Sequence, residues 1–167
     1  DFIVNVIETH MRENIKQQII VLAHNKSLLT YLHDAIRDRT SLSVGYYVGG
    51  MKDKDRKASE DCQVIIATYS MAAEGLDIKS LTTLLMATPK TDIVQAVGRV
   101  MRRDRKRVQQ KSGTIVIPIF ISDGDDADKA LKSSNFSTVW KVVRALRSHD
   151  EVFGKELDQL RVKLGRE

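Results

Sequence analysis

Three short, largely apolar runs restrict the folds open to this chain more than any other feature of its sequence. They lie at residues 18–23, 63–67 and 81–87. Apolar runs without polar alternation are typical of strands buried on both faces, as in a parallel sheet. Apolar residues at helical spacing occupy 2–14, before the first run, and 28–36, between the first and the second. The alternation predicts an α/β fold, with a mostly parallel sheet and helices on both faces.

Two further strands and a change of pattern complete the predicted organisation. Residues 43–48 read as a strand, and so do residues 113–121, where Pro118 predicts a place near a sheet edge or a strand end. After Asp123–Asp126, a predicted turn and helix start, apolar residues at helical spacing indicate helices over 136–146 and 152–164. The sequence therefore predicts an α/β domain over 1–121 and, packed on it, an α-helical extension over 122–167.

Charge, cysteine content and the lack of a long apolar run limit the partners and the cellular compartment that we expect. The 167 residues carry a formal charge of +5, which permits a polyanionic partner without requiring one. The single cysteine excludes an internal disulfide framework and favours a reducing compartment. No run approaches the about 20 apolar residues needed to span a bilayer. We expect an intracellular protein, in the cytoplasm, nucleoid, nucleus or a viral factory, without a membrane partner. Because the chain begins at Asp1, it reads as part of a longer protein.

The stretch at 95–102 combines an amide and two guanidinium groups on one helical face. Gln95, Arg99 and Arg102 are spaced at i, i+4 and i+7, while apolar residues share the opposite face. Gly98 costs a helix about 1 kcal/mol relative to Ala, but it allows a ligand or backbone to approach closely. The residues alone also fit a surface helix with solvated arginines.

A second stretch, at 67–78, follows the strand over 63–67. That strand delivers Thr68 to the carboxyl edge of the sheet, where open α/β sheets bind ligands. The hydroxyls of Thr68 and Ser70 can donate to phosphate without reading sequence. The carboxylate of Asp77 can accept a hydrogen bond from a ribose hydroxyl, or it can cap the following turn. We read Thr68 and Ser70 as part of a loop that ends at Gly75.

The two stretches together resemble a known family. Gln-x-x-Gly-Arg-x-x-Arg at 95–102 resembles motif VI of superfamily 2 helicases and translocases, and 67–78 resembles motif V, in the same order and at a fitting spacing. The resemblance implies a RecA-like fold of the P-loop NTPase type. It implies arginine fingers at Arg99 and Arg102, with Gln95 orienting the nucleotide. ATP contacts are implied at Gly75, Asp77 and Gly98.

Nucleic-acid contacts are predicted at the ends of the first three strands. The turn at 24–27, where Asn25 or Ser27 can cap the next helix, resembles motif IV, and its helix amides can hold a phosphate or serve in capping alone. Gly49 and Gly50 allow a sharp turn or close approach of a ligand, and related helicases often have a glycine pair here. The predicted nucleic-acid set is Asn25, Lys26, Ser27, Gly49, Gly50, Thr68 and Ser70.

The sequence lacks the parts with which such motors hold a triphosphate. Asp150-Glu151 and Gly154-Lys155 only superficially match the magnesium and phosphate motifs, because they fall within helical sequence. The resemblance therefore implies a second motor lobe, inactive as an ATPase alone. It implies that ATP and Mg²⁺ are bound mainly by an N-terminal RecA-like lobe of the same protein, with no metal site in this chain.

The form Gly-Arg-Val-Met-Arg and the trailing helices look more like DNA-repair, restriction and large-virus helicases, so the resemblance favours DNA over RNA. A non-motor RecA-like module that binds nucleic acid or protein is the alternative. A Rossmann-type nucleotide enzyme fits poorly, because no Gly-x-Gly-x-x-Gly follows the first strand.

Overall fold

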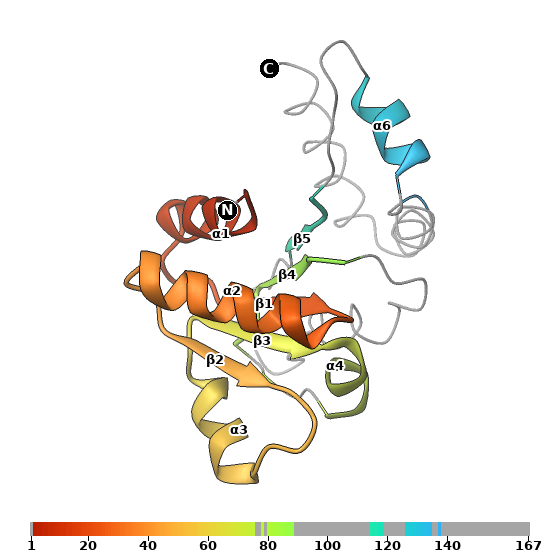
Figure 1. Ribbon diagram of the computed structural model, residues 1–167. Coiled ribbons are helices and arrows are strands. Elements are labelled where there is room, and N and C mark those ends of the chain that lie inside the picture. The colour runs from red at the N-terminus through yellow and green to blue at the C-terminus, as the bar shows by residue number, and fades with distance from the viewer. Residues whose placement is uncertain are drawn as a thin grey trace, which may run out of the picture. The chain divides into compact units, whose positions relative to one another are not determined.

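The computed structural model describes residues 2–75, 78, 80–88, 114–118, 126–134 and 137 (Figure 1). These residues belong to two compact units, each of which is described by itself. The described residues up to Thr88, together with 114–118, lie in the first unit, and those from Asp126 onward lie in the second. The predicted boundary between 121 and 122 lies outside the described residues, so it stays a prediction.

A five-stranded, wholly parallel sheet forms the centre of the first unit. Its strand order is β2-β3-β1-β4-β5, and every neighbouring pair is parallel. The strands are β1 (Ile19–Ala23), β2 (Val44–Tyr47), β3 (Val64–Thr68), β4 (Thr83–Met86) and β5 (Thr114–Val116). Parallel pairing brings the carboxyl ends of all five strands to one edge. The predicted parallel sheet is confirmed, and β1, β3 and β4 are buried along their whole length as their apolar runs indicated.

Two helices cover one face of this sheet (Figure 1). They are α1 (Phe2–Glu13) and α2 (Lys26–Arg39), and their apolar residues join one core cluster with alternate residues of the strands, such as Val21 and Ile66. Burying an aliphatic side chain of this size contributes about 1.5–3 kcal/mol relative to leaving it exposed. Within the predicted helix over 2–14, the buried residues are Val4, Ile7 and Met11, whereas Ile3 is only partly buried.

On the opposite face, α3 (Asp53–Glu60) packs against the outer strand β2. Gly45 of β2 pairs with Ile65, which faces away from its neighbour Ile66 and therefore away from α1 and α2. A Cβ on Gly45 would lie 2.9 Å from the Cα of Ser59 in α3. Glycine is required there because the helix backbone packs directly on the strand. Helices on both faces are thus confirmed.

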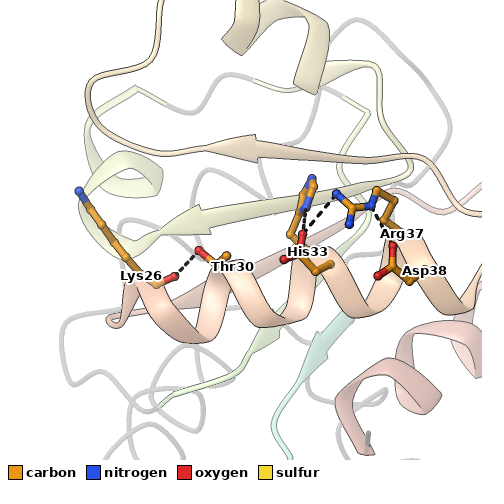
Figure 2. A network of polar contacts seen from close by, with 6 residues as sticks. Lys26, Thr30, His33, Arg37 and Asp38 are labelled. Carbon is orange, nitrogen blue, oxygen red and sulfur yellow. Dashed lines mark hydrogen bonds and ion pairs between the residues drawn. The ribbon is translucent and has the colours of Figure 1, made fainter.

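One ring stack joins α2 to the outer strand β2, and polar contacts link side chains along α2 itself (Figure 2). The ring of His33 stacks on Tyr46 with centroids 4.1 Å apart and planes 14° apart. His33 Nδ1 also lies 3.2 Å from Asp34 Oδ1. Arg37 contacts the carboxylates of Asp34 and Asp38 on the same helix. The stacked pair sets the rotation of α2, which in turn sets the position of its first turn at the sheet edge.

Gln18 holds together the amino edge of the sheet. Its side-chain amide donates to the carbonyl oxygens of Glu60 at 2.7 Å and Cys62 at 2.8 Å. Its side-chain oxygen accepts from Ser80 Oγ at 2.6 Å. The Gln18 side chain is buried, and these bonds satisfy it fully. It therefore joins the end of α3 and the turn before β4 to the start of β1.

One predicted element is wrong, and two other predictions are confirmed. The segment after Thr68 was read as a loop, but it forms the short helix α4 (Tyr69–Gly75), because Met71, Ala72 and Ala73 favour helix and Ala72 is buried. β5 is an edge strand that ends before Pro118, as proline predicted. In the second unit, α6 (Ala127–Ser133) begins directly after Asp126, as predicted.

The helices predicted over 95–102 and 152–164 lie outside the described residues, and of the helix predicted over 136–146 only residue 137 is described. Within the described part of the chain, no helix has both the length and the apolar content to cross a bilayer.

Candidate nucleic-acid interface

The register of the sheet brings most of the predicted nucleic-acid residues to one edge. Ala23 at the end of β1 is the Cα partner of Thr68 at the end of β3, and Tyr47 of β2 pairs with Ala67. The segments that leave β1, β2 and β3 therefore begin at one level. These segments hold Asn25–Ser27, Gly49–Gly50 and Ser70 respectively.

At the end of β1, Asn25 is the N-cap of α2. Its backbone is extended, with φ −96° and ψ 120°, and its side-chain oxygen accepts from the Ser27 amide at 2.8 Å. Of the two capping residues that the sequence allowed, the structure selects Asn25 and places Ser27 in the first turn. A cap of this kind contributes about 1 kcal/mol, and the remaining first-turn amides point out of the helix end.

Lys26 supplies a positive charge beside these amides. It is exposed, and its main-chain carbonyl accepts from Thr30 Oγ1 at 3.0 Å (Figure 2). Among the described residues, none forms an ion pair with the Lys26 ammonium group. A cation next to helix amides suits a phosphate, because both the charge and the helix dipole favour an anion there.

The glycine pair after β2 contains one glycine that the backbone requires. Gly50 has φ 85°, in the left-handed region that glycine tolerates without strain. A Cβ on Gly50 would meet nothing within 4 Å, so the turn leaves open space for a ligand. The nearest atom to a Cβ on Gly49 is Sδ of Met71 in α4, at 4.0 Å. The turn after β2 therefore lies next to α4.

The two hydroxyls at the end of β3 have different surroundings. Thr68 is only 9% exposed, whereas Ser70 in the first turn of α4 is exposed. Their oxygens, Thr68 Oγ1 and Ser70 Oγ, lie 3.3 Å apart and share a hydrogen bond. Ser70 is thus the hydroxyl open to a ligand, and Thr68 is placed to orient it.

Three residues that the sequence reading passed over join the same edge, and we call them the edge cluster: His24, Tyr69 and Thr88. The Tyr69 hydroxyl donates to the main-chain carbonyl of Thr88. The rings of His24 and Tyr69 lie 4.8 Å apart, and the His24 amide donates to Thr88 Oγ1 at 3.0 Å. Burial raises the pKa of Tyr69 far above its ordinary value, against a smaller lowering by the bond to Thr88. The phenol therefore stays a neutral donor.

Of the residues predicted to contact the nucleotide, the structure describes one. Gly75 is the last residue of α4. Asp77, Gln95, Gly98, Arg99 and Arg102 lie outside the described residues, so their roles stay predictions.

Comparison with known proteins decides the family. Residues 2–104 match the family described as the helicase conserved C-terminal domain. This match covers more than half of the chain. This chain belongs to that family. The matched region contains both stretches that resemble motifs V and VI. The chain thus contains a helicase C-terminal domain, in agreement with the resemblance to superfamily 2 that the two motifs carry.

Similar proteins agree with this assignment. A putative ATP-dependent RNA helicase of Acanthamoeba polyphaga mimivirus is 43% identical over 93 residues, which make up 56% of this chain and 17% of that protein. The chain therefore spans less than a fifth of that relative.

Solved structures show the same fold. The ATP-dependent Type ISP restriction-modification enzyme LlaBIII, solved bound to DNA, has a TM-score of 0.56 and 26% identity over 86% of this chain and 11% of its own. Domain 2 of the DEAD-box helicase Mss116p, solved bound to an RNA duplex, has a TM-score of 0.52 and 13% identity over 87% of this chain and 69% of its own. These likenesses confirm the RecA-like fold.

Proposed function

We propose that this chain is the second motor lobe of an ATP-dependent nucleic-acid helicase or translocase. The observation that carries the proposal is the family match over 2–104, which spans the sheet edge described above and the arginine-bearing stretch at 95–102. In such a motor, one ATP site is completed by two lobes. This lobe contributes contacts to the nucleic-acid backbone and arginines to the nucleotide.

The nucleic-acid side of the proposal rests on the carboxyl edge. The exposed hydroxyl of Ser70, the charge of Lys26 and the open turn at Gly50 lie on three segments that start at one level. Hydroxyls, ammonium groups and helix amides bind phosphate oxygens without distinguishing bases. The lobe would therefore hold a strand whatever its sequence, as a motor that moves along it requires.

The nucleotide side of the proposal rests on the resemblance. Arg99 and Arg102 would stabilise charge that develops on the γ-phosphate, a contribution of roughly 10³ to 10⁵ in rate in well-studied nucleotide hydrolases. Gln95 would orient the nucleotide, and Gly75, Asp77 and Gly98 would contact it. ATP and Mg²⁺ would be held mainly by the N-terminal lobe. Closure of the two lobes around ATP would then alter the hold on the strand.

The choice between DNA and RNA is a separate part of the proposal. The predicted preference for DNA gains no support from the mimivirus relative, whose name is that of an RNA helicase. One similar structure was solved with DNA and the other with RNA. The contacts proposed above are to phosphates, which both nucleic acids share. Single strands of equal length and sequence, as DNA and as RNA, are the direct comparison.

ATP hydrolysis by the full-length protein, measured with and without each strand, tests the proposal. We expect hydrolysis that a strand stimulates, and none by residues 1–167 alone. A full-length protein that binds nucleic acid yet hydrolyses no ATP with either strand would contradict the motor and favour the non-motor binding module.

A further inference from the structure

Tyr69 lies between two hydroxyl residues of the proposed interface, but its own hydroxyl is directed elsewhere. Thr68 and Ser70 share a hydrogen bond near the ligand side of the edge, whereas the Tyr69 hydroxyl donates to the carbonyl of Thr88. Tyr69 is 2% exposed and therefore makes no direct contact with a bound nucleic-acid strand. Tyr69 lies in the first turn of α4, the helix that also contains Ser70, so its contacts hold that helix in position.

The contact between Tyr69 and Thr88 crosses the sheet. β3 and β4 are not neighbours, because β1 lies between them. Adjacent strands are about 4.8 Å apart, so the ends of β3 and β4 are separated by two such spacings. The tyrosine ring spans this distance past His24, the residue that follows β1. One side chain thus links the ends of three strands.

Both ends of the link lead to functional segments. At one end Tyr69 is followed by Ser70, the exposed hydroxyl. At the other end Thr88 follows β4, directly before the segment that contains Gln95, Arg99 and Arg102. The His24 amide holds Thr88 from a third side, so the edge cluster limits movement of the β4 end relative to α4. A displacement of α4 would therefore be passed to the end of β4.

We propose that Tyr69 is a positioning residue that couples the nucleic-acid contact at Ser70 to the arginine-bearing segment after Thr88. The inference rests on the proposed motor function and adds a residue to it. A strand bound at Ser70 shifts or steadies α4, and the hydrogen bond from the Tyr69 hydroxyl passes this change to Thr88. The cluster thereby links strand binding to the rate of ATP hydrolysis.

The test compares Tyr69→Phe with wild type in the full-length protein, using a single strand of fixed length as the activator. Phenylalanine keeps the ring packed against His24 and removes only the donor to Thr88. We expect turnover at saturating strand to fall about five- to tenfold, the size expected for losing one buried hydrogen bond. The strand concentration for half-maximal turnover should change by less than about twofold, because Ser70 and Lys26 remain.

Tyr47→Phe is the matched control. Tyr47 is also a buried tyrosine, but it lies in β2, away from Thr88. Its variant should keep saturated turnover within about twofold of wild type. If Tyr69→Phe fails to fold, Thr88→Val tests the other contact that holds Thr88 in the edge cluster. Valine keeps the shape of Thr88 and the main-chain carbonyl that accepts from Tyr69, but it removes the hydroxyl that accepts from the His24 amide. A smaller fall in saturated turnover is expected, again without a change in the half-maximal strand concentration.

Separate outcomes overturn the inference and the proposed function. A rise in the half-maximal strand concentration at unchanged saturated turnover would show that Tyr69 only places Ser70 locally. A lower melting temperature with both kinetic quantities unchanged would show a purely structural role. Either result overturns the coupling while the motor function stands. Wild-type protein without any strand-stimulated hydrolysis would overturn the proposed function and, with it, this inference.

Discussion

Single residues at the carboxyl edge differ in ways that their residue types do not reveal. Thr68 and Ser70 have the same functional group and were equal candidates by sequence. The structure buries the first and exposes the second, with a hydrogen bond between them. Exposure depends on the packing around the end of β3, so no local pattern could have separated the two. We therefore propose the phosphate contact at Ser70, with Thr68 orienting its hydroxyl.

Ser70→Ala should lower affinity for single strands about three- to tenfold, because one hydrogen bond to phosphate is lost. The loss should be equal for strands of unrelated sequence, since phosphate contacts do not read bases. Fluorescence anisotropy with two such strands measures it. Ser41→Ala, at an exposed serine before β2 and so at the opposite edge, is the control that should bind as wild type. A loss for one sequence only would contradict a backbone contact.

The glycine pair offers a second test at single residues. Gly50→Ala should lower the free energy of unfolding by about 1–2 kcal/mol, because alanine is strained at φ 85°. Gly49→Ala should change it by less than about 0.5 kcal/mol, since the nearest atom to its new Cβ is 4.0 Å away. Urea unfolding compares the two. Equal losses would show that the two positions do not differ in backbone strain.

Among the elements, those buried on both faces were predictable and those defined by long-range contacts were not. β1, β3 and β4 were predictable because every residue of each strand is buried, and such strands are written as continuous apolar runs. α4 was read as a loop, since a helix of 7 residues that opens with Tyr69 and Ser70 has too few turns for a periodic pattern. The bond from Tyr69 to Thr88 joins residues 19 positions apart, and it depends on the strand order.

Gln18 provides a test of how the elements at the amino edge are held. Gln18→Leu should lower the free energy of unfolding by about 2–4 kcal/mol, because it leaves the buried partners of its side chain unsatisfied. Chemical denaturation measures this loss. Strand affinity of the folded variant should match wild type, since Gln18 precedes β1 at the edge opposite Ser70. A free energy of unfolding equal to that of wild type would show that the side-chain hydrogen bonds of Gln18 do not stabilise the fold.

At the scale of the whole molecule, the proposed function makes this chain one half of a motor. The sheet edge would contact a nucleic-acid strand, and the stretch at 95–102 would contact a nucleotide held by another lobe. Motif spacing predicted this division because Gln-x-x-Gly-Arg-x-x-Arg and the stretch at 67–78 are local patterns. The roles of the two arginines rest on that pattern alone, since they lie outside the described residues.

The most direct measurement is strand-stimulated ATP hydrolysis by the full-length Arg102→Ala variant. Arg103→Ala, at the adjacent arginine outside the motif, serves as the control. We predict that Arg102→Ala lowers the stimulated rate by roughly 10³ or more while ATP still binds to the other lobe. Arg103→Ala should stay within about twofold of wild type. A stimulated rate for Arg102→Ala equal to that of wild type would contradict the assignment of this chain as the lobe that supplies the arginine fingers.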